Sequence, residues 1–320
     1  MDTIVVGIDV SKDKLDIAVR PSGEIFSTSR DAAGLDAVIA RLAPLAPAVV
    51  AVEATGGFET VVAASLAAAG LPVVVVNPAQ VRSFAQALGK RAKTDPIDAA
   101  VIAHFAEATK PEIRPLPDAA TQLLSDLTAR RRQIIQMIVA ERQRQRRLVG
   151  KRLQKSIARL LKALEKELSA LDQSIDDAVR GSPAWREKED LLASVPGVGP
   201  VIARTLIAEL PELGTLGRKE IAALAGLAPW TRQSGKWKGK SFIGGGRSSV
   251  RAALFMGALV AARYNPALRA FKQRLVDAGK PKLVAIIAVA RKLLTILNAV
   301  LRDKQPWRGA IEQELAHAKP

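Results

Sequence analysis

Residues 4–11, Ile4-Val5-Val6-Gly7-Ile8-Asp9-Val10-Ser11, decide how the N-terminal part of the chain folds. The run begins with β-branched residues, which predict a short strand. The polar turn Ser11-Lys12-Asp13-Lys14 separates it from a second apolar run, Leu15 to Val19. Pro21-Ser22-Gly23 predicts another turn, towards a third short strand near Ile25-Phe26-Ser27. The chain therefore opens with antiparallel strands.

The segments that follow alternate between helix and strand. Apolar residues recur at helical spacing between residues 35 and 42, and Ala48 to Val52 reads as a buried strand. A break at Gly70-Leu71-Pro72 precedes another strand, Val73 to Val76. Antiparallel strands followed by β-α-β units predict a mixed α/β sheet domain.

Three prolines, Pro111, Pro115 and Pro117, interrupt this alternation. They mark a boundary, and we place the first domain at residues 1–115.

A helical arm is predicted for residues 116–182. Its central part has no Gly or Pro apart from Gly150, and its apolar residues keep near-heptad spacing, which indicates a coiled coil or a helical hairpin. Gly181-Ser182-Pro183 breaks the arm. Residues 183–320 are predicted to form a mostly helical third domain, whose one long loop, Pro229 to Gly246, has three consecutive glycines and no acidic residue.

The composition narrows the classes of partner and chemistry. A formal net charge of +17 and a pI of about 10.4 favour a polyanionic partner, most commonly nucleic acid. We find no lipidation motif, no signal peptide and no apolar run of 18 residues, and we therefore expect a cytoplasmic protein without a membrane partner. The absence of cysteine excludes disulfides, thiolate zinc sites and cysteine nucleophiles, which leaves carboxylates and hydroxyls.

Positive charge is concentrated in the arm, where 13 Lys and Arg residues lie between Arg130 and Lys166 and acidic residues are few. Such a run can be a solvated helix face, but the imbalance of sign favours a face that lies along phosphates. The predicted nucleic-acid contacts are Arg130, Arg131, Arg132, Arg144, Arg146, Arg147, Lys151, Arg152, Gly197, Gly199, Lys236, Lys238, Lys240, Arg247 and Arg251.

Four carboxylates stand at positions that suit a shared site. Asp9 closes the first strand and Glu53 closes a later one, so both can meet at one edge of the sheet. Asp95 and Asp98 lie in Lys93-Thr94-Asp95-Pro96-Ile97-Asp98, where Thr94 suits a helix N-cap and a spacing of three puts both aspartates on one helical face.

Like charges placed together repel unless a cation lies between them. Mg²⁺ or Mn²⁺ fits, because hard ions take oxygen ligands, and two such ions can clamp a phosphodiester. Each acid taken singly has an ordinary explanation as a turn or helix-start residue. Together, on a basic chain without cysteine, they indicate a metal site on a nucleic-acid enzyme.

The order of four motifs resembles one family. Gly-Ile-Asp-Val-Ser-Lys, Val-Glu-Ala-Thr-Gly, Asn77-Pro78-Ala79 and Lys-Thr-Asp-Pro-Ile-Asp-Ala are similar to the DEDD transposases of the IS one-ten insertion-sequence family, whose relatives include the Piv-type DNA invertases. The resemblance covers almost the whole chain. It implies a RuvC-like, ribonuclease-H-type N-terminal domain in which Asp9, Glu53, Asp95 and Asp98 bind the metal.

The C-terminal half resembles the same family. Ser194-Val195-Pro196-Gly197-Val198-Gly199-Pro200 looks like a helix-hairpin-helix turn, which serves either as a phosphate contact or as a plain turn between helices. The resemblance implies that Ser234, in Gln233-Ser234-Gly235, is a nucleophile that holds a DNA end as a phosphoserine. Ser241, Ser248 and Ser249 are nearby alternatives, because the glycine- and lysine-rich loop departs from the family pattern.

The resemblance also implies partners: donor and target DNA, a bridge RNA whose pairing supplies specificity, and a homodimer or homotetramer. Trp230 and Trp237 flank Ser234 and could stack on bases, although packing is the commoner role of tryptophan. Two other functions stay open, a RuvC-like structure-selective nuclease that uses water and a non-enzymatic nucleic-acid-binding protein. Clustered acids count against the latter.

Overall fold

The computed structural model describes residues 3–90, 95–114, 116, 118–231, 233–235 and 237–308. The side chains of Asp95, Pro96 and Lys238 also lie outside the description, as do Thr94, Pro115, Pro117 and Lys236. The chain divides into an N-terminal unit, Met1–Leu116, and a C-terminal unit, Pro117–Pro320. We describe each unit by itself, and the predicted boundary at residue 182 stays a prediction.

The N-terminal unit is built on one five-stranded sheet with the order β3-β2-β1-β4-β5. Its elements are β1 Val5–Val10, β2 Lys14–Arg20, β3 Glu24–Ser29, α1 Ala32–Leu42, a short 3-10 turn Ala43–Leu45, β4 Val49–Glu53, α2 Phe58–Ala68, β5 Val73–Val76, α3 Pro78–Ala87 and α4 Asp95–Thr109. β1, β2 and β3 are antiparallel neighbours, whereas β4 is parallel to β1 and β5 to β4. The mixed sheet predicted from the sequence is confirmed, and it is consistent with a RuvC-like domain.

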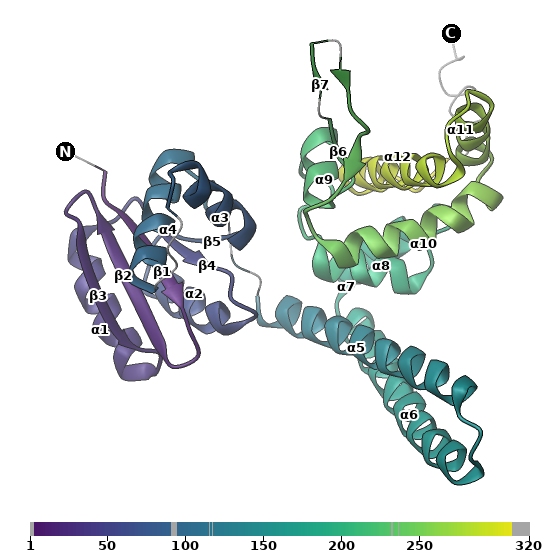
Figure 1. Cartoon of the computed structure of the whole chain (residues 1–320), viewed down its shortest axis with the longest axis horizontal. Helices are drawn as coiled ribbons and strands as arrows, with labels where there is room; N and C mark the ends of the chain where they lie inside the picture. The colour runs from purple at the N-terminus through teal and green to yellow at the C-terminus, as the bar shows by residue number, and fades with distance from the viewer. Residues whose placement is uncertain are drawn as a thin grey trace. The chain divides into compact units, whose positions relative to one another are not determined.

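Helices cover both faces of this sheet (Figure 1). The face that carries Val6, Ile8 and Val10 packs against apolar residues of α1 and α2. The opposite face, with Val5 and Ala51, packs against α3 and α4. Because side chains alternate along a strand, odd-numbered residues of β1 and β4 lie on the α4 side.

α4 crosses β1 with no side chain between the two backbones. A Cβ atom at Gly7 would lie 2.8 Å from Ala103 Cα and would collide with the backbone of Ala99 as well. Ala99 and Ala103 are fully buried and form a small cluster with Ala18 of β2. Small residues on both elements therefore bring α4 down onto the centre of the sheet.

The C-terminal unit is mostly helical, as expected. Its elements are α5 Ala119–Arg147, α6 Lys151–Gly181, α7 Pro183–Ala193, α8 Pro200–Glu209, α9 Arg218–Leu224, β6 Pro229–Trp230, β7 Gln233–Ser234, β8 Trp237–Lys238, β9 Phe242–Ile243, α10 Ser248–Tyr264, α11 Pro266–Asp277 and α12 Lys282–Asp303.

α5 and α6 form a helical hairpin (Figure 1). The chain reverses at residues 148–150, around the glycine that the sequence analysis singled out. Ile134 and Ile138 of α5 pack against Leu161 and Leu171 of α6. The two helices thus bury one apolar face against each other and leave their basic residues largely outside.

α12 is the central helix of this unit. Ten of its residues are buried, and it packs against α7, α9, α10 and α11. Within the described part of the chain, it is also the one helix long and apolar enough to cross a membrane by length and composition. Its burial accounts for that apolar character, because the core helix of a globular unit meets the same criteria.

The segment from Pro229 to Gly246, expected to be a loop, contains two short antiparallel ladders. β6 pairs with β9 at the base of the segment, and β7 pairs with β8 at its tip. Figure 1 shows these strands extending as a narrow ribbon from the helices of the unit. We call residues 229–243 the serine ribbon, because Ser234 lies in it.

Candidate catalytic carboxylates and serine ribbon

Asp9 and Glu53 lie side by side at one edge of the sheet. β1 and β4 are parallel neighbours with Ile8 opposite Val52, so Asp9 and Glu53 occupy the next register position. Both residues are partly buried. By strand alternation they lie on the face that α4 covers. This placement agrees with the sequence analysis, whereas the role of the two carboxylates as metal ligands stays a prediction.

The first turn of α4 comes to the same edge. Gly7 contacts α4 at Ala99 and Ala103, and Val5 belongs to the same apolar cluster as Phe105 and Ala106 farther along the helix, which indicates that α4 runs antiparallel to β1. Asp98 precedes Ala99 and is partly buried. The start of α4 therefore points towards the strand end that carries Asp9. The helix begins at Asp95, as predicted, but the side chain of Asp95 lies outside the described residues.

A further carboxylate, which the sequence analysis did not select, lies beside Asp9. Asp16 of β2 is directly opposite Asp9 in the β1–β2 ladder and is 1% exposed. Its Oδ1 atom accepts a hydrogen bond from Ser27 Oγ at 2.5 Å and pairs with Lys14 Nζ at 2.7 Å. The sequence signal that could have identified Asp16 is an acidic residue between Leu15 and Ile17, inside an apolar run that predicts a strand.

The donor set suits a hard divalent cation in its chemistry, because Asp9, Glu53 and Asp98 offer carboxylate oxygens. Over the part of the chain that the structure describes, no group of three or more His, Asp or Glu side chains is placed to hold a metal ion. The predicted ligand set is thus described only in part, since it includes Asp95. Of that set, the structure brings Asp9 and Glu53 to adjacent register positions and α4 to the same edge.

Ser234 lies in the C-terminal unit, on the serine ribbon. It is exposed, and Gly235 beside it has a φ of +54°, a backbone conformation that favours glycine. Ser234 is directly opposite Trp237 in the β7–β8 ladder. The ribbon has no acidic residue, so activation of the serine hydroxyl has to come from elsewhere.

Several predicted nucleic-acid contacts form ion pairs within the chain. The nitrogen–oxygen pairs are Arg131 with Asp172 (2.5 Å), Arg132 with Glu209 (2.5 Å) and Arg247 with Glu212 (2.5 Å). Arg144 pairs with Glu141 on the same helix, and Arg251 donates to the carbonyl oxygen of Gly245 at 2.6 Å. A phosphate would have to compete with these acceptors.

Other predicted contacts are exposed cations near the turn of the helical hairpin. Arg146 and Arg147 end α5, and Lys151 and Arg152 begin α6. Arg130 and Lys240 are exposed as well, whereas Lys236 and the side chain of Lys238 lie outside the described residues. The hairpin turn is therefore the most accessible group of predicted contacts.

The glycines of the turn between α7 and α8 differ from each other. Gly197 has a φ of +107°, and a Cβ there would lie 2.6 Å from the Cβ of Ala261. Close packing against α10 thus accounts for Gly197 without a phosphate. Gly199 is the N-cap residue of α8 and has open space around it. Phosphate contact at this turn stays a prediction.

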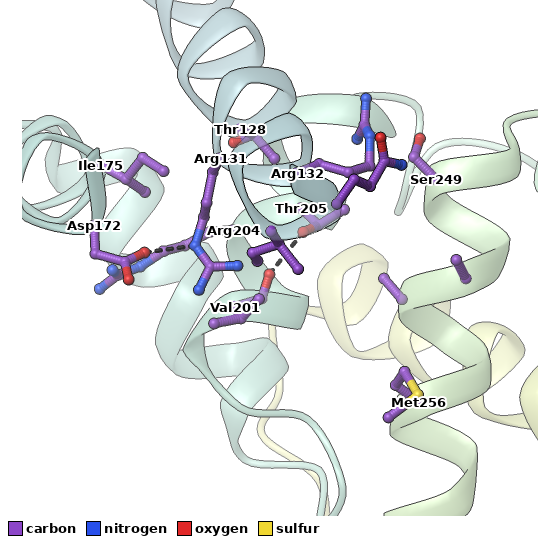
Figure 2. A pocket seen from close by; sticks show the side chains of 14 residues that line it. Thr128, Arg131, Arg132, Asp172, Ile175, Val201, Arg204, Thr205, Ser249 and Met256 are labelled. Atoms are coloured by element: carbon purple, nitrogen blue, oxygen red, sulfur yellow. Dashed lines mark hydrogen bonds and ion pairs between the residues drawn. The ribbon is translucent and has the colours of Figure 1, made fainter. Parts of the chain in front are cut away.

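A cavity of about 300 Å³ lies between α5, α6, α8 and α10 (Figure 2). Its lining combines polar and apolar side chains, and Figure 2 shows Arg131 beside Asp172 on one side and Ser249 on the opposite side. Ser234 does not line it. The cavity is therefore distinct from the serine ribbon of the same unit.

Comparison with known proteins identifies the family. A DEDD transposase model of the IS110 type, described as transposase, matches residues 6–151, and a second model, described as transposase IS116/IS110/IS902 family, matches residues 189–273. The pilin gene-inverting protein of Moraxella bovis is 32% identical over 268 residues, which are 82% of this chain and 82% of that protein. This chain belongs to the IS110 family of transposases.

Other relatives of this transposase include proteins of insertion elements. An uncharacterized 43.6 kDa protein of insertion element IS110 from Streptomyces coelicolor is 31% identical over 151 residues, 46% of this chain and 36% of that protein. Membership of the family implies cleavage and rejoining of DNA. The first family match spans all four predicted carboxylates, and the second spans Ser234.

Proposed function

We propose that this transposase cuts and rejoins donor and target DNA through a phosphoserine on Ser234, with Asp9, Glu53, Asp95 and Asp98 holding Mg²⁺ or Mn²⁺. The observation that carries the proposal is the docking of α4 on β1. Backbone contact at Gly7 brings the start of α4 to the strand end where Asp9 and Glu53 lie in adjacent register. Acidic groups gathered on a chain of charge +17 favour a cation between them.

The exposed position of Ser234 suits attack on a large substrate. In the proposed step, Ser234 Oγ bonds to phosphorus and the bond to the leaving sugar oxygen breaks. That oxygen takes up a proton and departs as a hydroxyl, while the serine proton passes to solvent. Attack by a hydroxyl of another strand reverses the step and restores a phosphodiester, so rejoining needs no external energy source. A bound divalent ion would stabilise charge on the phosphate as a Lewis acid.

Guidance by a bridge RNA and assembly into a homodimer or homotetramer are part of the proposal. Exposed cations at the turn of the α5–α6 hairpin suit contacts to nucleic-acid backbone, which carry no sequence information. Base pairing with an RNA would then supply the sequence specificity. We expect strand exchange, as distinct from binding, to require the RNA encoded beside the gene.

A covalent-adduct assay tests the nucleophile. The full-length protein is incubated with the flanking RNA, Mg²⁺ and DNA that carries the element junction, and protein–DNA adducts are separated on a denaturing gel. We expect an adduct with the wild-type protein and with the Ser241→Ala control, and none with Ser234→Ala. An adduct that survives Ser234→Ala contradicts the assignment.

The same assay tests the carboxylates and the alternative reaction. Asp9→Asn and Asp98→Asn should reduce cleavage to background, whereas Asp13→Asn, an exposed acid in the neighbouring turn, should not. Chelation of the divalent ion should reduce cleavage to background, as the Asp9→Asn and Asp98→Asn variants do. Cleavage that leaves no adduct and tolerates Ser234→Ala would instead indicate a RuvC-like nuclease that uses water.

A further inference from the structure

The serine ribbon carries a group of exposed aromatic side chains. Trp230 and Trp237 are each 60% exposed, and Phe242 is 47% exposed. In contrast, Trp185 and Trp307 pack against the core of the C-terminal unit. Aromatic residues make up only 4% of the chain, yet three exposed ones lie within this short ribbon.

The register of the ribbon places one of these rings next to the predicted nucleophile. Trp237 is directly opposite Ser234 in the β7–β8 ladder. Residues directly opposite each other in an antiparallel pair have side chains on the same face, with Cβ atoms about 5 Å apart. The side chains of Trp237 and Ser234 therefore lie on the same face of the ladder.

A second aromatic pair lies at the base of the ribbon. Trp230 is opposite Phe242, and their rings are nearly parallel, with an interplanar angle of 9° and centroids 6.3 Å apart. The indole nitrogen of Trp230 donates to the carbonyl oxygen of Gly244 at 3.4 Å. This contact orients the ring while most of its surface stays open.

The charge around these rings selects the chemistry of the partner. From Pro229 to Arg251 the sequence has six Lys or Arg residues and no acidic residue. Exposed aromatic rings with positive charge are the combination that binds single-stranded nucleic acid, because each base has a stackable face and the backbone is anionic. An apolar protein partner would not require this surplus of positive charge.

We propose that Trp237 stacks on an unpaired DNA base beside the phosphodiester that Ser234 attacks, and that the Trp230–Phe242 pair receives a second base of the same strand. The position beside the attacked phosphodiester rests on the proposed role of Ser234. Stacking on Trp237 would hold the strand against the ribbon without reading its sequence. It would thereby position the phosphate for the serine hydroxyl.

A binding assay separates stacking from charge. Full-length Ser234→Ala protein, without Mg²⁺ or RNA, is titrated into fluorescently labelled oligothymidylate about 20 nucleotides long, longer than one such binding site. An abasic oligonucleotide of equal length and charge serves as the second probe. We expect Trp237→Ala to weaken oligothymidylate binding by roughly 5- to 100-fold, as for loss of one stacked base, and to leave abasic binding unchanged.

Two variants serve as controls. Trp237→Phe should recover most of the affinity, because a stackable ring returns. Lys240→Ala should weaken binding of both probes to a similar extent, because it removes only charge. Trp237 is exposed, so the variant should keep the melting temperature of the parent protein.

The proposal is overturned if Trp237→Ala leaves oligothymidylate binding unchanged, or weakens abasic binding equally. If Trp237→Ala weakened the binding of oligouridylate and not that of oligothymidylate, this result would overturn the assignment to DNA and indicate RNA. The binding assay contains no cleavage step, so its outcome is distinct from that of the adduct assay. Trp237-dependent binding without any Ser234 adduct would uphold the stacking surface and reject the nucleophile.

Discussion

Gly7 of β1 and Ala103 of α4 are in contact backbone to backbone, with no side chain between them. This contact sets the position of α4 on the sheet and hence the position of Asp98 relative to Asp9. The glycine of the Gly-Ile-Asp motif thus has a structural reason, because any side chain at this position would lift α4 from β1.

Gly7→Ala should therefore destabilise the N-terminal unit by roughly 1–3 kcal/mol or more, the range for a side chain forced into a packed interior. It should also reduce DNA cleavage, because the start of α4 would move away from the sheet edge. Urea denaturation of the full chain measures the first effect. Gly181→Ala is the control, since its Cβ would meet open space. Equal stability of both variants would contradict the backbone contact.

Asp16 provides a second test at the same edge of the sheet. Its buried carboxylate accepts a hydrogen bond from Ser27 Oγ at 2.5 Å. Ser27→Ala should lower the free energy of unfolding by roughly 1–3 kcal/mol, because the buried carboxylate loses one of its two partners and keeps only Lys14. Ser27→Thr keeps the hydroxyl and suits a strand, so it should be close to wild type. A wild-type midpoint for Ser27→Ala in urea denaturation would show that the hydrogen bond contributes nothing.

Arg204 joins three helices of the C-terminal unit. Its guanidinium pairs with Asp176 of α6 at 2.6 Å and with Glu189 of α7 at 2.7 Å. Burial by itself would lower the pKa of Arg204, but hydrogen bonds and charge from these two carboxylates outweigh it and raise the pKa. Arg204 therefore carries its positive charge at neutral pH.

Arg204→Met should cost roughly 2–4 kcal/mol in unfolding free energy, somewhat less than for a fully buried pair. Glu189 loses its counter-charge, and Asp176 keeps only the exposed Arg180. Arg180→Met is the matched control. Arg180 also pairs with Asp176, but its side chain is 72% exposed, so its loss should cost no more than about 0.5 kcal/mol. Urea denaturation distinguishes the two, and equal costs would contradict the role assigned to Arg204.

The start of α5 should show a pH-dependent contribution to stability. Hydrogen bonds from the side chain and amide of Thr121 hold the pKa of Asp118 below its ordinary value of 3.8. A lowered pKa in the folded state means that the cap stabilises the protein above pH 3.8 and that this is lost as pH falls through the folded value.

We therefore expect the melting temperature of Asp118→Ala to lie below that of wild type at neutral pH, and the difference to shrink as the pH falls below about 4. Asp118→Asn keeps a neutral acceptor for the cap, so it should lower the melting temperature at neutral pH less than Asp118→Ala does. Thermal denaturation followed by circular dichroism measures both differences. A gap between wild type and Asp118→Ala that is constant with pH would show that the carboxylate charge does not contribute.

Local patterns were sufficient to predict much of the N-terminal unit. β-branched runs and turn residues predict β1, β2, β4 and β5 to within one or two residues, because strand formation there follows alternation and nearby turns. The position of Asp16 opposite Asp9 depends on register, and the burial of Asp16 depends on α4 as well. Neither can be deduced from a local pattern.

The C-terminal unit shows why longer-range features were missed. Leu123 of the predicted arm is 56% exposed, whereas its neighbour Leu124 is buried in the main core, which contains residues of α8 as well as the end of α6. Arg132 finds its partner, Glu209, 77 residues away. The β6–β9 and β7–β8 ladders have two residues per strand, which is too short for any periodicity to show.

The identity of the residue that carries DNA is the most direct test of the proposed mechanism. Protein–DNA adducts can be digested with nuclease and trypsin, and the nucleotide remnant can be located by mass spectrometry. Cleavage after Lys and Arg places Ser234, Ser241 and the pair Ser248–Ser249 in three separate peptides. We predict the remnant on the peptide 233–236, attached to Ser234. A remnant on either of the other two peptides would contradict the account.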